Sequence, residues 1–163
     1  MGSVLSSRIC ILLPLISRSL SPNVHAPISK KLDSVNNMQK TQTVFERMRQ
    51  GEIVLGTVIT VTDPTVTEAL CSVYDFLWID MEHNALSLEV VQNHLLATKG
   101  TNVTALVRVP WNDPVLIKPV LDIGAHGVIV PFIRSVEETR LAVSACLYPP
   151  DGIRGYGPRR PSN

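Results

Sequence analysis

An aspartate, a glutamate and a histidine occur within four residues in the stretch Asp80-Met-Glu-His83, directly after an apolar run. A carboxylate that holds one imidazole nitrogen fixes the tautomer and raises the basicity of the other, which is how a general base is made. Arg108 follows a second apolar run, and a guanidinium can hold a carboxylate or an enolate oxygen in fork geometry. His83 and Arg108 are therefore candidates for acid–base chemistry at an oxyanion, with Asp80 and Glu82 as supporting groups.

Each of these residues has a structural alternative. A histidine at the end of a strand is more often a satisfied polar residue than a base. Asp80 and Glu82 could be solvated turn residues, and Arg108 could pair with Asp113. A site is favoured because two adjacent strands would deliver complementary groups to the same edge of a sheet.

The elements that must position these groups alternate between strand and helix, with a repeat of about 25 residues. Strands that are apolar on both faces, between amphipathic helices, indicate a parallel sheet with helical cover. Asp63, Ser87, Asp113 and Ser135 are the expected N-caps of the helices. The expected strands are 53–61, 76–80, 104–109 and 127–131, and the expected helices are 44–50, 65–73, 88–98, 115–122 and 135–147.

A doubly wound sheet and a (β/α)₈ barrel both satisfy this α/β pattern. No Gly-x-Gly-x-x-Gly follows the first strand, which weakens the dinucleotide-binding version of the doubly wound sheet. A full barrel needs at least about 200 residues, so a barrel would here be truncated to about its first four βα units. Its first and fourth strands would be open edges, which favours self-association into a homo-oligomer.

Composition excludes some classes of protein. The formal net charge is +1, and lysines and arginines are dispersed, so the electrostatic footprint of nucleic-acid binding is missing. The three cysteines are far apart and form no C-x-x-C pair, which indicates neither a disulfide framework nor a zinc site.

Residues 1–40 differ from the rest and are expected to be a leader, with the folded domain in 41–163. No acidic residue occurs from Met1 to Leu32, while basic residues are spread among serines, as in an organelle transit peptide. A secretory signal with 9–16 as its apolar core and a disordered extension are the alternatives. The apolar run is too short to span a membrane, so no membrane partner is expected, and the location is predicted to be mitochondrial or cytoplasmic.

Three motifs in order, "DFLWIDMEH", "LVRVPWNDPVLIKPVLDIGAHGVIVP" and "YPPDGIRGYGPRR", closely resemble the HpcH/HpaI aldolase family of metal-dependent class II pyruvate aldolases. The resemblance runs from about Gly56 to Arg160. It implies a (β/α)₈ TIM barrel of the phosphoenolpyruvate/pyruvate type and a carbon–carbon lyase that reversibly cleaves a 4-hydroxy-2-oxo acid to pyruvate and an aldehyde. It also implies a divalent Mg, Mn or Co ion.

The resemblance assigns roles to three catalytic candidates. His83 is implied to be the acid/base that acts on the substrate hydroxyl, Arg108 to bind the substrate and stabilise the enolate, and Asp122 to raise the basicity of the histidine. Asp122 falls at the end of a helix, before the fourth strand, and therefore at the opposite face of its own barrel from His83. We expect Asp122 to serve a neighbouring subunit, with Asp80 as the nearer intrachain partner of His83.

In the family the metal is held by a Glu and an Asp at the ends of the fifth and sixth strands, and the matching positions lie beyond Asn163. No metal ligand is therefore assigned in this chain. Arg108 alone would have to offset the enolate charge, so the chain is expected to lack appreciable aldolase activity by itself. One alternative is a catalytically dead truncated homologue that acts only as an oligomer partner. A citrate-lyase-like acyl-CoA lyase is a third, disfavoured because no extended basic patch stands out.

Two further histidines are assigned no chemistry. His94, on the helix after Ser87, is expected to be exposed. His126, in a Gly-Ala-His-Gly turn, is expected to have a structural role.

Overall fold

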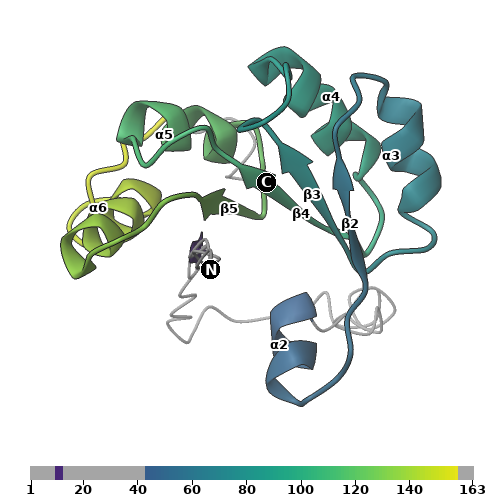
Figure 1. Cartoon of the computed structure of the whole chain (residues 1–163), viewed down its shortest axis with the longest axis horizontal. Helices are drawn as coiled ribbons and strands as arrows, with labels where there is room; N and C mark the ends of the chain where they lie inside the picture. Colours follow the sequence, from purple (N-terminus) through teal and green to yellow (C-terminus); the bar gives the residue numbers. More distant parts are fainter. Residues whose placement is uncertain (1–9, 13–42, 158–163) are drawn as a thin grey trace, which may run out of the picture.

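The computed structural model describes residues 10–12 and 43–157 (Figure 1). The expected leader lies outside the described residues, except for Cys10–Leu12. The elements are β1 (Cys10–Leu12), α2 (Val44–Arg49), β2 (Gly56–Ile59), α3 (Pro64–Leu70), β3 (Phe76–Asp80), α4 (Leu88–Ala97), β4 (Thr104–Arg108), α5 (Pro114–Asp122), β5 (Gly127–Val130) and α6 (Val136–Cys146).

The sheet has the strand order β1-β5-β4-β3-β2, and β2 to β5 are parallel neighbours in sequence order. Figure 1 shows α3 to α6 along the outer side of the curved sheet and α2 across its concave side. The predicted α/β fold with four successive βα units is confirmed.

Every outer helix begins at the cap that the sequence indicates. The side chains of Asp63, Ser87, Asp113 and Ser135 each accept a hydrogen bond from a backbone N–H of the first turn. The capping box expected at Ser135 is only half formed, because the Glu138 carboxylate accepts from the N–H of Arg134 instead, at 2.6 Å. Since each helix start follows a strand end, the caps lie along the edge where the strands finish.

The core lies between the sheet and the outer helices. Leu77 and Ile79 of β3 are fully buried there, together with Val107 of β4 and Val128 of β5. Because side chains alternate along a strand, Phe76, Trp78 and Asp80 lie on the opposite, concave side of β3.

Gly56 is required by the packing of this concave side. A Cβ built on Gly56 would lie 2.2 Å from the Cζ atom of Phe76, far inside van der Waals contact. The absence of a side chain at the start of β2 therefore lets the Phe76 ring lie against the neighbouring strand.

The helix α2 is held to the sheet by charged groups. The Nη1 atom of Arg47 lies 2.5 Å from Asp75 Oδ1, and its Nε atom lies 2.8 Å from Glu52. The second oxygen of Asp75 accepts from the backbone N–H of Leu55 at 2.8 Å. Asp75 thereby joins α2, the approach to β2 and the approach to β3 at the edge opposite the candidate site.

His94 was expected to be exposed, and the structure shows it fully buried. Its Nδ1 atom lies 2.7 Å from the Thr67 hydroxyl of α3, and its Nε2 atom lies 2.9 Å from the Val61 carbonyl. Its side chain therefore ties α4 to α3 and to the loop after β2. His126 has the structural role expected for it, since its Nδ1 accepts from the Ala105 N–H at 2.9 Å.

One of the two sheet edges that the sequence leaves open is covered. Cys10–Leu12 runs antiparallel to β5, with Cys10 opposite Val130 and Leu12 opposite Val128. An apolar edge strand offers unpaired N–H and C=O groups to any extended segment, which is the physical reason for such pairing. Among the described residues, β2 has no strand partner on its outer edge.

Within residues 43–157, no helix combines the length and the apolarity that a bilayer crossing requires.

Candidate active site

Asp80 and Arg108 end neighbouring strands and face one another in the β3–β4 register. The Nε atom of Arg108 donates to Asp80 Oδ1 at 2.8 Å, and Nη2 donates to Oδ2 at 2.6 Å. A bidentate pair of this kind fixes the plane of the guanidinium as well as its position. The hydrogen bonds that Arg108 donates to Asp80 are the largest cause of its raised pKa.

Asp80 also organises the turn that follows β3. Its Oδ1 accepts from the backbone N–H groups of Glu82 and His83 at 3.0 and 3.4 Å, and its Oδ2 accepts from Asn84 Nδ2 at 2.8 Å. Burial alone raises the pKa of Asp80, but the hydrogen bonds and the charge of Arg108 outweigh it, so the pKa lies below its ordinary value. The alternative of a solvated turn residue is excluded, because Asp80 is only 3% exposed.

Glu82 lies between the arginine and the histidine. Its Oε2 is 3.0 Å from Arg108 Nε, and its Oε1 is 3.4 Å from His83 Nε2. Asp80 was expected to be the nearer intrachain partner of His83, and this was wrong: Asp80 reaches only the backbone N–H of His83, because its side chain is turned to Arg108. The Glu82 side chain is 8% exposed and that of His83 is 67% exposed. The imidazole is therefore open to solvent, while the carboxylate that it contacts is buried.

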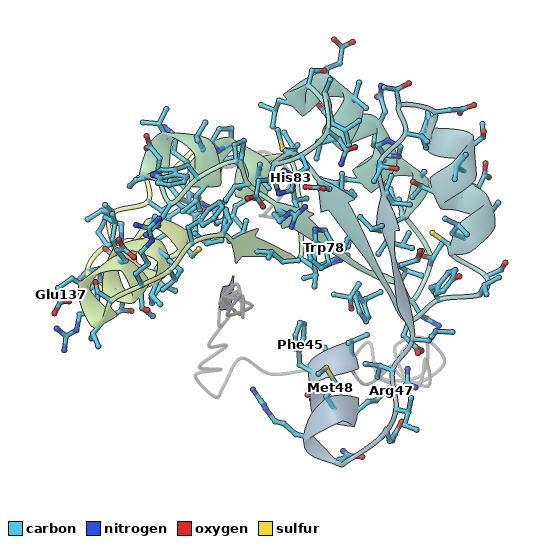
Figure 2. The ribbon with its side chains drawn as sticks, viewed as in Figure 1. Phe45, Arg47, Met48, Trp78, His83 and Glu137 are labelled. Atoms are coloured by element: carbon cyan, nitrogen blue, oxygen red, sulfur yellow. The ribbon has the colours of Figure 1, made fainter. Side chains whose placement is uncertain are left out.

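Trp78 lies beneath Arg108 on the concave side. The Cζ atom of Arg108 is 4.7 Å from the centre of the Trp78 ring, a cation–π distance. Figure 2 shows His83 where the strands end and Trp78 deeper on the concave side, toward which Phe45 rises from α2. Sequence reasoning missed Trp78, although strand alternation from Asp80 would have placed it on this side.

Asp122 is the one predicted site residue that the fold does not bring to this cluster. It ends α5, at the edge of the sheet where β5 begins, whereas His83 follows the carboxyl end of β3. Its Oδ1 accepts from Arg154 Nη2 at 2.6 Å, and Arg154 is 4% exposed and lies over the Tyr148 ring. Asp113, the alternative partner of Arg108, instead caps α5.

An aromatic pair follows the carboxyl ends of β4 and β5. The ring centres of Trp111 and Phe132 are 5.5 Å apart, and about half of each side chain is exposed. Phe132 has a φ of 57°, in the left-handed region that costs energy for a bulky residue.

The fit of a divalent ion can be tested on the residues present. Residues 43–157 contain no group of three or more His, Cys, Asp or Glu side chains placed to hold a metal. The two carboxylates nearest His83 are both engaged by Arg108. The described side chains therefore do not fit a metal ion.

A parallel α/β sheet with outer helices and ionisable groups at the carboxyl ends of adjacent strands is the arrangement of the barrel enzymes. Residues 59–160 match the model of the HpcH/HpaI aldolase/citrate lyase family. The chain belongs to this family.

The curated relatives include a hydroxypyruvate/pyruvate aldolase of Roseovarius nubinhibens, 41% identical over 72% of this chain and 46% of the relative. A 5-keto-4-deoxy-D-glucarate aldolase of Escherichia coli K12 is 39% identical over 64% of this chain and 41% of the relative. Among solved structures, an HpcH/HpaI aldolase from Desulfitobacterium hafniense DCB-2 has a TM-score of 0.65 and 31% identity, over 70% of this chain and 45% of that one. The chain thus spans less than half the length of these relatives.

Proposed function

We propose that this chain carries the acid–base and enolate-binding part of an aldolase site that reversibly cleaves a 4-hydroxy-2-oxo acid to pyruvate and an aldehyde. Cleavage removes a hydroxyl proton and leaves an enolate, so it needs a base and a cation at the enolate oxygen. The observation that carries the proposal is the Arg108–Glu82–His83 cluster, with its distances of 3.0 and 3.4 Å.

The residues take distinct parts in this chemistry. His83, whose side chain is mostly exposed, accepts the proton of the substrate hydroxyl. Arg108 donates its Nε and Nη2 hydrogens to Asp80, and its Nη1 has no partner among the described residues. Nη1 therefore donates to the carboxylate or the enolate oxygen of the substrate. The relatives named as aldolases of hydroxypyruvate/pyruvate and of 5-keto-4-deoxy-D-glucarate support a small carbonyl acid as substrate.

Ligand-observed NMR with pyruvate tests the binding half of this proposal. We expect saturation transfer to pyruvate from the wild-type chain and a loss of it in R108Q, which keeps a polar side chain but removes the guanidinium and its charge. R140Q is the matched control, since the Arg140 side chain is 77% exposed on α6, on the outer side of the sheet (Figure 1). Equal transfer in R108Q and the wild type would rule out Arg108 as the receptor.

Asp122 is proposed to act on the His83 of a neighbouring copy, because its position at the far edge of the sheet keeps it from the His83 of its own chain. A structure of the assembled oligomer tests this assignment. The assignment would be wrong if Asp122 lay farther than a Debye length, about 8 Å at physiological ionic strength, from every His83 of the oligomer.

We further propose that the chain releases no appreciable pyruvate on its own, because its described carboxylates do not fit the Mg, Mn or Co ion that the family implies. The test is a coupled pyruvate assay on the purified chain with a 4-hydroxy-2-oxo acid, with and without Mg²⁺. Mg²⁺-dependent release above that of H83N would contradict the proposal.

The second candidate function is that of an inactive oligomer partner. It is favoured by the outer edge of β2, which has no strand partner among the described residues and where Val58 is 47% exposed. Size-exclusion chromatography of the chain, alone and mixed with a full-length relative, distinguishes a homo-oligomer, a mixed oligomer and a monomer. A monomer under both conditions would exclude this role.

A further inference from the structure

The indole of Trp78 has one unusual property beside its contact with Arg108. Its Nε1 atom is buried and has no hydrogen-bond partner. A buried N–H that is left unpaired destabilises the fold by about 1–3 kcal/mol. Packing alone therefore does not explain a tryptophan at this position. A phenyl ring would support the guanidinium by the same kind of contact without that cost.

The other donors around the indole are already used. Asp80 takes the Nε and Nη2 atoms of Arg108, and Glu82 lies at 3.0 Å from Nε. Among the described residues, Nη1 of Arg108 and Nε1 of Trp78 have no hydrogen-bond partner, and the two side chains are in contact, with the guanidinium carbon 4.7 Å from the centre of the indole ring. Two unpaired donors on contacting side chains, one of them cationic, are groups of the kind that bind an oxyanion.

We propose that Trp78 completes the anion site of Arg108. Its ring face fixes the plane of the guanidinium, and its indole N–H donates to an oxygen of the bound 2-oxo carboxylate. Trp78 is thus a ligand-binding residue in addition to Arg108. This proposal rests on the proposed function, because it takes the ligand of Arg108 to be a 2-oxo acid.

The chain contains only two tryptophans, which allows each to be observed alone. Trp111 packs against Phe132 with the two rings tilted. W111F therefore leaves Trp78 as the single tryptophan, and W78F leaves Trp111. We expect oxamate, an unreactive planar analogue of pyruvate, to change the emission of W111F and to leave that of W78F unchanged. Titrations are run with and without Mg²⁺.

Affinity for oxamate, measured by NMR or calorimetry, gives the second readout. We expect binding about fivefold weaker in W78F, which keeps the ring face and loses the N–H, and weaker still in W78L, which loses both. W111F should bind as the wild type does. Because W78F removes an unpaired buried donor, its urea midpoint should not fall, so weaker binding would not be a consequence of a damaged fold.

The results separate this proposal from the function on which it rests. If oxamate and pyruvate bind neither the wild type nor W111F, the proposed function fails. If they bind, and R108Q abolishes binding, but W78F binds as tightly as the wild type, then the role of Trp78 is wrong while the function of Arg108 stands. Weaker binding in W78F at an unchanged unfolding midpoint supports the proposal.

Discussion

Arg108 and Asp80 form a two-point ion pair across adjacent strands, at 2.8 and 2.6 Å, so the guanidinium is held before any ligand arrives. The pair is mostly buried, since the two side chains are 15% and 4% exposed. A preorganised cation of this kind loses little freedom when it binds an oxyanion.

Removal of the Asp80 charge should destabilise the chain. D80N leaves Arg108 buried with only Glu82 as a charged partner, and we expect a loss of about 3 kcal/mol in the free energy of unfolding in urea. D151N is the control, because Asp151 is exposed and should change stability by less than about 0.5 kcal/mol. Similar urea midpoints for D80N and D151N would contradict the importance of the pair.

The pairing of Asp80 also predicts an effect of acid. The pKa of Asp80 is lowered in the folded state from its ordinary value of 3.8, so the stabilisation that the paired carboxylate provides is fully present above pH 3.8. It is lost as the pH falls through the lower folded value, because the carboxylate must then be protonated. Stability curves for the wild type and D80N should therefore converge on the acid side of about pH 4.

His94 predicts a second pH dependence, in a different range. Burial lowers its pKa from the ordinary value of 6.5, although the hydrogen bond to Val61 and the charge of Asp63 act in the opposite direction. Between the folded pKa and 6.5 the unfolded chain binds the extra proton, so stability falls as the pH falls through this range and is fully present above it.

The measurement for His94 compares urea midpoints at about pH 7.5 and about pH 5.5 in the wild type and H94Q. Gln92 lies on the exposed face of the same helix, so Q92H adds a histidine there as the control. The wild type should lose more stability on acidification than H94Q, and Q92H should behave as the wild type does. An equal loss in H94Q would show that another group is responsible.

Two acidic residues on helices test the difference between buried and exposed ion pairs. D122N leaves Arg154 buried and without its charged partner, and Arg154 Nε is already unpaired. We expect a loss of about 2 kcal/mol in unfolding free energy. Glu137 projects from α6 into solvent (Figure 2) and lies 4.0 Å from Arg140, with both side chains more than three quarters exposed. E137Q should therefore change stability by less than about 0.5 kcal/mol.

Gly56 gives a steric prediction. G56A places a methyl group inside the Phe76 ring position, and we expect a loss of about 1–3 kcal/mol. G157A is the control, because a Cβ at Gly157 has no atom within 4 Å. The double variant G56A/F76L should recover part of the unfolding free energy that G56A loses. If it recovers none, the strain does not come from contact with the Phe76 ring.

Local signals predicted most of the fold. The bounds of β3 agree with the expected 76–80, because an apolar run ends there at a charged residue and both faces of the strand are covered. The strand expected at 53–61 is shorter, at Gly56–Ile59, and Ile53 at the expected start is 92% exposed. Apolar character alone does not distinguish a strand from the extended segment leading into it.

The candidate site was predicted in part. His83, Glu82, Asp80 and Arg108 could be found because parallel strands bring their carboxyl ends together. The partner of His83 could not be predicted, because Asp80 and Glu82 are both close to it in sequence and both pair with Arg108. Only the folded structure shows that Glu82 also reaches His83 through its second oxygen. His94 could have been recognised as buried, since it shares a helix face with Val91, Leu95 and Thr98.

The pairing of β1 with β5 has a consequence for the order of folding. Contacts between β2, β3, β4 and β5 join segments close in the chain, and each closes a short loop. Cys10 and Val130 instead lie 120 positions apart in the chain (130 − 10), and closing so long a loop costs more entropy for only three residue pairs. The parallel units should therefore assemble first and β1 last, and in hydrogen exchange the amides of β1 should open at a lower free energy than those of β3 and β4.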